Sequence, residues 1–337
     1  MNDTLTTPRG DQGEALFEQN LRPGRLDEFT GQDRQRDNLR TYVQGARQRS
    51  EPLDHVLLHG PPGLGKTTMA YVIAAEMGVT LKATSGPVLE KKGDLSAILT
   101  DLKPGEVLFI DEIHRLRTAL EEILYKAMED NQLDVLIGQG PGARSVSIAI
   151  SPFTLVGATT RTGLLSSPLR DRFGITFHLD FYDVVALKKI ILRSAVILGV
   201  NVLPRAAEII AARSRGTPRV ANRLLRRLRD FAQVKGQGVI DEDITELSFK
   251  ALAVDELGFD ETDRRLLLTI VEKFNGGPVG LSTLATAVQE ERETVEDVYE
   301  PFLIKEGFIK VTSRGRVATE KALAYVGRPP DPGPLFK

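Results

Sequence analysis

The chain has 337 residues, of which 41% are hydrophobic and 27% charged, with a formal net charge of −2 and no cysteine. This length fits two or three domains of roughly 100 to 200 residues each, and the missing thiols exclude a disulfide framework, a thiolate zinc site and a cysteine nucleophile. No signal-peptide pattern and no run of about 18 apolar residues occurs, so we expect a cytoplasmic protein without a membrane anchor.

The first predicted elements follow a polar tail at residues 1–18. Between Leu53 and Leu179, short apolar runs alternate with helical patterns. That alternation is typical of βαβ units built around a mostly parallel sheet. We therefore expect a large α/β domain at residues 19–180.

The stretch GPPGLGKT, residues 60–67, fits the pattern of a phosphate-binding loop. It stands between an apolar strand and a helical pattern, which is the context that such a loop needs. Backbone N–H groups freed by the glycines would meet phosphate oxygens at the start of the helix, the lysine would add a charge at the β and γ phosphates, and a threonine would offer a hydroxyl to Mg²⁺. A chance glycine-rich turn is the alternative. The nucleotide-binding residues expected here are Gly63, Gly65, Lys66, Thr67 and Thr68.

Two acids end the next apolar strand, VLFIDE, at residues 107–112. A carboxylate at a strand tip can reach Mg²⁺ in the neighbouring loop, while the following acid polarises the attacking water. We therefore assign Asp111, with Thr67, to the metal and Glu112 to general base catalysis. A solvated acid pair at a strand end is the alternative.

The segment QLDVLIGQGPGARSVSIAI, residues 132–150, predicts a β-hairpin. Alternating apolar residues flank a glycine-proline turn and would share one face of the ribbon. This face either packs on the sheet or forms a docking surface.

A third apolar strand, FTLVGATT, ends at Thr160. A polar residue at this place can hold the lytic water or sense the γ-phosphate, and we select Thr160, with a plain strand-end threonine as the alternative.

The next motif, SSPLRDRFG, places Arg170 and Arg172 in a short polar turn, too far along the fold to serve the chain's own loop. An arginine offered to a neighbouring subunit's γ-phosphate fits that placement and is worth about 10³ to 10⁵ in rate, whereas ordinary surface arginines are the alternative.

Strand patterns stop after residue 180, and three amphipathic helical patterns predict a small helical domain at residues 181–254. The last of these begins with Thr217 as N-cap and Pro218 at the first helical position. Arg219 lies in the first turn, where the helix dipole disfavours a cation. We therefore expect a compensating anion, either a bound phosphate or a nearby acidic side chain.

Residues 255–328 show three helical patterns followed by a strand-turn-strand, GFIKVTSRGRVAT. This order is typical of a winged-helix domain, whose third helix can enter the major groove. We expect Thr294 and Asp297 to form a capping box for that helix and Pro301 to kink it. A few local cations suffice for contacts with phosphates, although a domain used only for protein contacts is the alternative. The candidate DNA-binding residues are Arg292, Lys310, Arg314 and Arg316. Residues 329–337 form a second tail.

Taken together, GPPGLGKT, FIDEIHRL, GATTR, SPLRDRFG and GTPRVANRLL resemble the motifs of AAA+ ATPases. Their order and spacing resemble in particular the bacterial ring motors that migrate Holliday junctions, over roughly residues 15 to 328. The resemblance implies an α/β AAA+ core with a helical lid and a C-terminal winged helix. It also implies ATP and Mg²⁺ as cofactors, a homo-hexamer, and duplex and four-way junction DNA as substrates.

The same resemblance implies roles for single residues. Arg172 matches the trans-acting finger, and Arg219 matches the second sensor. Relatives often carry an arginine where this chain has Val311, beside Lys310. The residues expected near the nucleotide by resemblance are Leu21, Arg22, Tyr182, Glu129, Asp130 and Asn131. A RuvA-like junction-binding protein would dock on hairpin 132–150, and a RuvC-like resolvase would join the complex.

A second function class stays open at this point. An ATP-dependent protein remodeller or regulator would use its winged helix to recognise a protein or a promoter. The excess of acids over bases in residues 255–337 favours it, and the salt dependence of DNA binding distinguishes the two classes.

Overall fold

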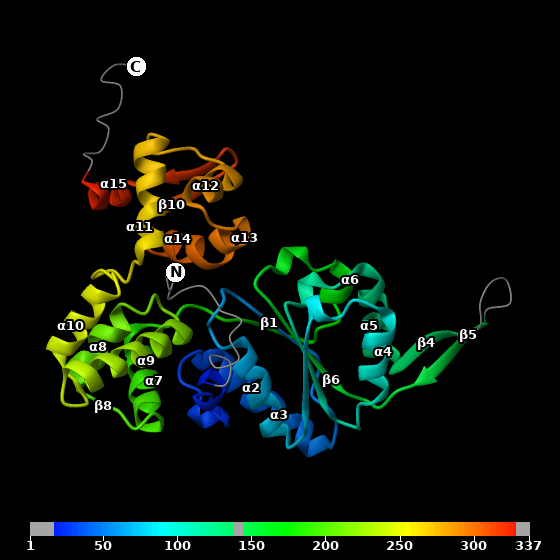
Figure 1. Cartoon of the computed structure of the whole chain (residues 1–337). Coiled ribbons are helices and arrows are strands. Elements are labelled where there is room, and N and C mark those ends of the chain that lie inside the picture. The colour runs from blue at the N-terminus through cyan, green and yellow to red at the C-terminus, as the bar shows by residue number, and fades with distance from the viewer. Residues whose placement is uncertain (1–16, 138–143, 328–337) are drawn as a thin grey trace. The chain divides into compact units, whose positions relative to one another are not determined.

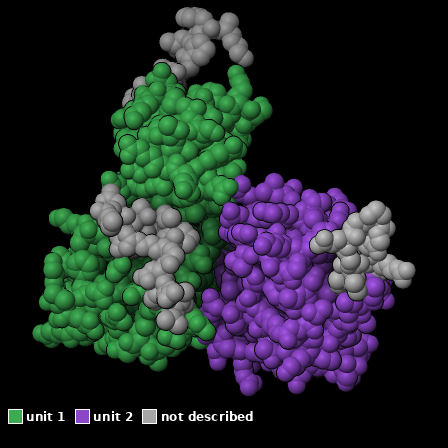
Figure 2. All heavy atoms as spheres, turned by 45° about the vertical axis from the view of Figure 1, so that its right-hand side comes forward, with its two compact units in different colours: residues 1–21, 61–63, 181–337 green, residues 22–60, 64–180 purple. Residues whose placement is uncertain are grey.

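The computed structural model describes residues 17–137 and 144–327. The chain forms two compact units (Figure 2): unit 1 comprises residues 1–21, 61–63 and 181–337, and unit 2 comprises residues 22–60 and 64–180. The predicted division into domains at 19–180, 181–254 and 255–328 stays a prediction, because unit 1 groups the last two segments together.

Unit 2 is built around a five-stranded sheet with the strand order β2-β3-β6-β1-β7. Figure 1 labels the neighbouring strands β1 and β6 of this sheet. Every pairing in this sheet is parallel, as the alternating pattern predicted. All five carboxyl ends therefore lie at one edge. The strands are β1 (Val56–His59), β2 (Leu81–Ser85), β3 (Val107–Asp111), β6 (Thr154–Thr159) and β7 (Ile175–His178). No sequence pattern predicted β7, whose four residues alternate buried and exposed.

Helices follow the strands and cover the sheet of unit 2. Leucines of α4 and α5 share one core cluster with side chains of β3 and β6, so these helices bury their apolar faces on the sheet. The helical segments are η1 (Leu26–Glu28), α2 (Asp33–Arg49), α3 (Lys66–Met77), η2 (Gly86–Val88), α4 (Lys92–Thr100), η3 (Ile113–Arg115), α5 (Thr118–Asp130), η5 (Thr162–Leu164) and α6 (Ser167–Arg170).

The predicted hairpin is present as β4 (Gln132–Ile137) and β5 (Arg144–Ala149), paired antiparallel with Leu133 opposite Ile148. Its turn lies outside the described residues. Leu133 and Ile150 are buried in the core cluster of unit 2, whereas Val146 is 42% and Ile148 39% exposed. The base of the hairpin packs on the unit, and apolar side chains of β5 face solvent.

The first part of unit 1 is helical, with α7 (Val184–Ile197), α8 (Pro204–Ala212), α9 (Pro218–Lys235) and α10 (Glu242–Ala251). Three of these helices match the predicted helical patterns, whereas α10 was not predicted. Asp241 caps α10 by accepting a hydrogen bond from the Ile244 N–H. A short parallel pair, β8 (Asn201–Val202) and β9 (Val239–Ile240), joins the loops between helices.

The second part of unit 1 has the predicted order of a winged helix, three helical segments and then a β-ribbon around one core cluster. The ribbon pairs Lys310 with Val317. A helix that the sequence analysis did not predict, α15, follows it and is capped by Thr319. The elements are α11 (Glu261–Leu268), η6 (Thr269–Lys273), α12 (Leu281–Val288), α13 (Arg292–Thr294), η7 (Val295–Tyr299), α14 (Glu300–Lys305), β10 (Ile309–Thr312), β11 (Gly315–Ala318) and α15 (Glu320–Val326).

The expected capping box of the third helix is wrong. The helix begins at Arg292 with Glu291 as N-cap, and Thr294 already has helical dihedral angles inside it. A π-helical turn, η7, precedes Pro301. Because proline offers no N–H to the preceding turn, the wider turn accommodates Pro301 within the third helix.

Candidate active site

The phosphate loop depends on glycines whose backbone lies at positive φ, which side chains disfavour. Gly60, Gly63 and Gly65 have φ values of 140°, 79° and 95°. A Cβ atom on Gly60 would lie 2.3 Å from the carbonyl oxygen of Leu179, so no other residue fits there. The loop therefore presents backbone rather than side chains where a phosphate would bind.

Lys66 and Thr67 begin α3, directly after the loop. Lys66 is 8% exposed and donates a hydrogen bond from Nζ to the carbonyl oxygen of Gly60, 2.8 Å away. Its ammonium group is thus held back across the loop that would receive the phosphates. Thr68, next in the same turn, continues the helix.

Thr67 and Asp111 come together at the carboxyl edge of the sheet. The Thr67 hydroxyl lies 3.3 Å from Oδ2 of Asp111, and Oδ1 of Asp111 accepts the Glu112 N–H at 2.9 Å. Across residues 17–137 and 144–327, no cluster of three or more acidic or histidine side chains could hold a metal by itself. Mg²⁺ in nucleotide sites uses one or two protein oxygens and completes its shell with phosphate and water, and this hydroxyl-carboxylate pair fits that requirement.

Glu112 and Thr160 lie at the same edge. Glu112 follows β3 with a positive φ of 47°, and its carboxylate forms an exposed ion pair with Arg115 at 3.1 Å. Thr159 is buried and bonded to other groups, since its hydroxyl lies 3.0 Å from His114 Nδ1 and accepts the Arg161 N–H. Thr160 is the first residue beyond β6, beside the strand that leads into the phosphate loop.

The two histidines of the loop strand have different surroundings. Nδ1 of His55 accepts the Leu155 N–H at 2.9 Å, so its Nε2 carries the hydrogen and faces the carbonyl oxygen of Met128. His59 lies against His178, with their Nδ1 atoms 3.2 Å apart. Burial lowers the pKa of His59, and the neighbouring His178 and Lys66 lower it further. His59 is therefore neutral at physiological pH.

The candidate finger lies at the opposite edge of the sheet. Arg172 precedes β7, and the first residue of β7, Ile175, pairs with Val56, the first residue of β1. The phosphate loop follows the last residue of β1. A four-residue strand rises about 10 Å between its first and last residues, so Arg172 and the loop belong to opposite edges.

The Arg172 side chain is held by neighbours on α5 and α6. Its guanidinium forms an ion pair with Glu129 at 2.9 Å, donates to the carbonyl oxygen of Pro168 at 2.7 Å and lies over the ring of Tyr125 at 4.8 Å. Arg170 is exposed. The structure thus brings Arg172 together with Glu129. Asp130 and Asn131 follow at the end of α5, where Asn131 has a positive φ of 51°.

Arg219 lies in the first turn of α9 in unit 1, as expected. Thr217 caps this helix by accepting the Val220 N–H, and the Arg219 N–H lies 3.4 Å from the carbonyl oxygen of Gly63. The anion that accompanies Arg219 is Glu18, whose Oε1 accepts a hydrogen bond from Nε at 3.0 Å. Glu18 was expected to lie in a loose tail, and no sequence pattern marked it. Residues 17–20 form a helical turn instead, so residues 17 and 18 belong to a helix and not to the predicted tail.

The residues expected near the adenine lie on both units. Leu21 is buried in unit 1, where its carbonyl oxygen accepts a hydrogen bond from Arg193. Tyr182 is buried and donates its N–H to the carbonyl oxygen of Gly216. In unit 2, the guanidinium of Arg22 lies 5.1 Å from the ring centre of Tyr71.

The winged helix separates its cations into exposed and internal ones. Arg292, Lys310 and Arg314 are exposed. Arg316 instead makes a two-pronged ion pair with the buried Glu300, at 2.5 and 2.8 Å. This pair joins the β10–β11 ribbon, the wing of the domain, to the third helix, and Arg316 as a phosphate ligand stays a prediction.

Helix-based DNA recognition finds little support in the third helix. Glu291 and Glu293 flank Arg292 at its start, and all three side chains are exposed. Further along, the carbonyl oxygen of Val298 accepts a hydrogen bond from Arg215 of the helical part. The wing, with Lys310 and Arg314, is therefore the better candidate for backbone contacts.

The parallel sheet, the phosphate loop and the carboxylates at its edge define a P-loop ATPase with the AAA+ arrangement of core and helical lid. Three family models match consecutive segments: the P-loop domain of the Holliday junction DNA helicase RuvB matches residues 21–179, the RuvB AAA lid domain 182–255, and the RuvB C-terminal winged helix domain 256–327. The chain belongs to the RuvB family and is thus a DNA-dependent ATPase of DNA recombination and repair. The predicted fold class and family are confirmed.

Solved structures agree with this assignment. The RuvB Holliday junction branch migration motor of Thermotoga maritima is 52% identical, with a TM-score of 0.85 over 92% of this chain and 99% of that one. A lysine-to-arginine mutant of the Thermotoga protein is 52% identical, with a TM-score of 0.85 over 91% of this chain and 98% of that one. A threonine-to-valine mutant of the same protein is 51% identical, with a TM-score of 0.85 over 92% of this chain and 99% of that one. In the part of the chain that the structure describes, no helix is long and apolar enough to cross a bilayer.

Proposed function

We propose that this chain works in the cytoplasm as a homo-hexameric ring that hydrolyses ATP between its subunits to pull duplex DNA and migrate four-way junctions. One observation carries the proposal. The phosphate loop and the acids lie at the carboxyl edge of the sheet, whereas Arg172 lies at the amino edge. A finger at that edge serves the loop of another copy more readily than its own.

ATP and Mg²⁺ are the proposed cofactors. Thr67 and Asp111 hold the ion, which when bound neutralises charge that develops on the phosphates. The loop amides and Lys66 bind the phosphates. Glu112 takes the proton of the attacking water, which Thr160 orients. The half-exposed position of Glu112 leaves its carboxylate accessible to that water.

The neighbouring copy supplies the second half of the proposed site. Arg172 approaches the γ-phosphate, and Glu129 to Asn131 contribute from the same edge. The ion pair between Arg172 and Glu129 keeps the guanidinium in place until a phosphate competes for it. Arg170, the last residue of α6, is exposed and is the second candidate at this edge. Arg219 acts as a sensor of the nucleotide, and Leu21, Arg22 and Tyr182 lie near the adenine.

DNA is the proposed load. Lys310, Arg314 and Arg292 contact phosphates without reading sequence, as suits a motor that moves along any duplex. The exposed apolar face of β5 is the proposed docking surface for a RuvA-like junction-binding protein, and a RuvC-like resolvase acts on the same junction.

Mixed rings test action between subunits. Arg172→Ala is titrated into wild-type protein at constant total concentration, and ATP hydrolysis is measured with a synthetic four-way junction. We expect activity to fall more steeply than the wild-type fraction, because each variant copy disables its neighbour's site. Arg49→Ala, at the exposed end of α2, is the control and should cause no such excess loss, whereas an excess loss with Arg170→Ala in place of Arg172→Ala would make Arg170 the finger. A strictly proportional loss with Arg172→Ala would contradict action in trans, and Lys66→Ala should abolish hydrolysis altogether.

A further inference from the structure

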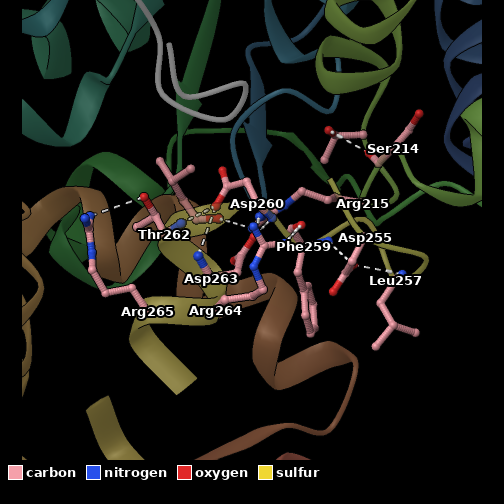
Figure 3. A network of polar contacts seen from close by, with 12 residues as sticks. Ser214, Arg215, Asp255, Leu257, Phe259, Asp260, Thr262, Asp263, Arg264 and Arg265 are labelled. Atoms are coloured by element: carbon pink, nitrogen blue, oxygen red, sulfur yellow. Dashed lines mark hydrogen bonds and ion pairs between the residues drawn. The ribbon is translucent and has the colours of Figure 1, made fainter. Parts of the chain in front are cut away.

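A buried arginine crosses from the helical part of unit 1 to its winged helix. Arg215 lies in the turn between α8 and α9, is 4% exposed and has a positive φ of 55°. Its Nη1 donates to Oδ2 of Asp263 on α11, a residue that is completely buried. Figure 3 shows this contact within a network of polar groups around the start of α11.

The same guanidinium also contacts the third helix of the winged domain. Nη2 donates to the carbonyl oxygen of Val298 at 3.4 Å. The cation lies 5.5 Å from the ring centre of Tyr299 and 4.7 Å from that of Phe302. One side chain therefore contacts two helices of the winged domain at the same time, through hydrogen bonds and through aromatic faces.

The receiving carboxylate is itself fixed. Oδ2 of Asp263 accepts the Asp260 N–H at 3.1 Å, and Asp260 in return accepts the Asp263 N–H at 3.0 Å. This reciprocal capping box ties Asp263 to the start of α11. A displacement of Arg215 must consequently move the helix and not only a flexible side chain.

The turn that carries Arg215 is packed closely on its other sides. A Cβ atom on Gly258 would lie 2.6 Å from the carbonyl oxygen of Arg213, and one on Gly216 would lie 3.0 Å from Phe181 and 3.1 Å from Nζ of Lys305. The turn is thus in close contact with the segment before α11 and with Lys305 of α14.

Two arginines of this short segment have different partners. Arg219, four residues after Arg215, is the proposed nucleotide sensor, and Thr217 between them caps the helix that holds it. Buried ion pairs contribute little to stability compared with apolar replacements, but they can enforce one geometry. The planar fork of arginine, which pairs and stacks at once, is not reproduced by lysine.

We propose that Arg215 is a positioning residue that couples the nucleotide sensor to the winged helix. It transmits displacement of the α9 start to α11 and to the third helix, so that the helical part and the winged part move together as one rigid body, which we call the lever. This inference rests on the proposed function, because the displacement is driven by nucleotide at Arg219.

The test combines Arg215→Lys and Asp263→Asn with a matched control in the same turn. The control is Arg213→Lys, since Arg213 forms a two-pronged pair with Glu246 and lies over Phe249, all inside the helical part. ATP hydrolysis and migration of a synthetic junction are measured in parallel. We expect Arg215→Lys to keep ATP hydrolysis within about twofold while junction movement per ATP falls about five- to tenfold, the size of effect typical of lost coupling. Arg213→Lys should change neither.

A distance measurement reports the lever without any DNA. The chain has no cysteine, so spin labels at Val234→Cys on α9 and Ser313→Cys on the wing are unique, and both positions are exposed. We expect one narrow distance distribution in the parent and a broad one in Arg215→Lys and Asp263→Asn, with the melting temperature checked for each variant. Asp263→Asn keeps the shape of the side chain, and it serves if Arg215→Lys fails to fold.

Two results would overturn the inference. One is a narrow distribution and intact coupling in folded Arg215→Lys; the other is an equal loss of hydrolysis and movement, which would mark a structural role. If the proposed function itself failed, the unaltered chain would show no junction movement, whereas the distance distributions would still report whether Arg215 holds the lever.

Discussion

The carboxylate of Glu18 accepts a hydrogen bond from Nε of Arg219 over 3.0 Å. Both side chains are less than a third exposed. A cation in the first turn of a helix is disfavoured by the helix dipole, and Glu18 supplies the anion that compensates it. The sensor candidate is therefore neutralised by the chain's own N-terminal segment, in the place where we expect a phosphate to act.

Removing this carboxylate should strengthen ATP binding. In Glu18→Gln the phosphate no longer competes with an acid for Arg219, and an ion pair of this exposure contributes ~1 kcal/mol, or about fivefold in affinity. Calorimetric titration with a non-hydrolysable ATP analogue measures the effect. Glu208→Gln, which removes the surface partner of Lys188, is the control and should leave affinity unchanged. Equal affinities for Glu18→Gln and the parent would show that Glu18 does not compete.

The hydroxyl of Thr67 should set the requirement for Mg²⁺. Thr67→Ser keeps the oxygen that faces Asp111, whereas Thr67→Val keeps the shape and removes the oxygen. We expect the serine variant to retain the parent's dependence on free Mg²⁺ and the valine variant to need at least about tenfold more, the scale typical of lost metal ligation. ATP hydrolysis measured across a Mg²⁺ series distinguishes them, and parallel curves for all three proteins would remove Thr67 from the metal site.

Substitution of the two arginines of the wing should have different effects, one on stability and the other on DNA binding. Arg316→Ala leaves the buried carboxylate of Glu300 without its partner, so we expect a loss of about 3 kcal/mol in the free energy of unfolding. Arg314→Ala touches only the exposed turn and should leave stability unchanged while it reduces the salt slope of DNA binding by about 1. Chemical denaturation and binding to a duplex at several salt concentrations provide the readouts. A reversed pattern would return Arg316 to the set of phosphate ligands.

The exposed side of the hairpin should be required for a partner and not for folding. Ile148→Ser changes a side chain that is 39% exposed, whereas Leu133→Ser on the paired strand changes one that is 1% exposed. We expect Ile148→Ser to keep the melting temperature and to abolish stimulation of ATP hydrolysis by a RuvA-like protein. Leu133→Ser should instead lower the free energy of unfolding by about 2 kcal/mol or more, as is typical of core substitutions. Undiminished stimulation of Ile148→Ser would place the docking surface elsewhere.

Patterns local in sequence predicted most of the fold. The phosphate loop with its flanking strand and helix, the acids after β3 and the helix-helix-helix-ribbon order each occupy one continuous stretch. What the sequence did not predict depends on contacts between distant residues. Glu18 meets Arg219, and Arg215 meets Asp263, across long separations that leave no spacing pattern. β7 is recognisable only through its pairing with β1, since four residues carry too little periodicity.

The same limit applies to the surroundings of Arg316 and Thr294. Arg316 looked like a member of a basic cluster because its neighbours in sequence are cations, and only the fold brings Glu300 to it. Thr294 had the right spacing to Asp297 for a capping box, but the helix had already begun at Arg292.

Acidification should weaken unit 2 through His59. Burial, His178 and Lys66 lower the pKa of His59 from its ordinary value of 6.5, so between that value and the lowered one the unfolded chain binds more protons than the folded chain. Stability from this source is therefore present above pH 6.5 and is lost as the pH falls toward the folded-state pKa, with a slope of at most about 1.4 kcal/mol per pH unit. Thermal unfolding of the parent, His59→Gln and His178→Gln at pH 5 to 8 tests this. We expect His59→Gln to lose less stability on acidification than the parent, and His178→Gln to fall between them, because one of the causes that lower the pKa of His59 has been removed. An NMR titration that places the pKa of His59 at or above 6.5 would contradict the argument, since the folded state would then gain from protonation.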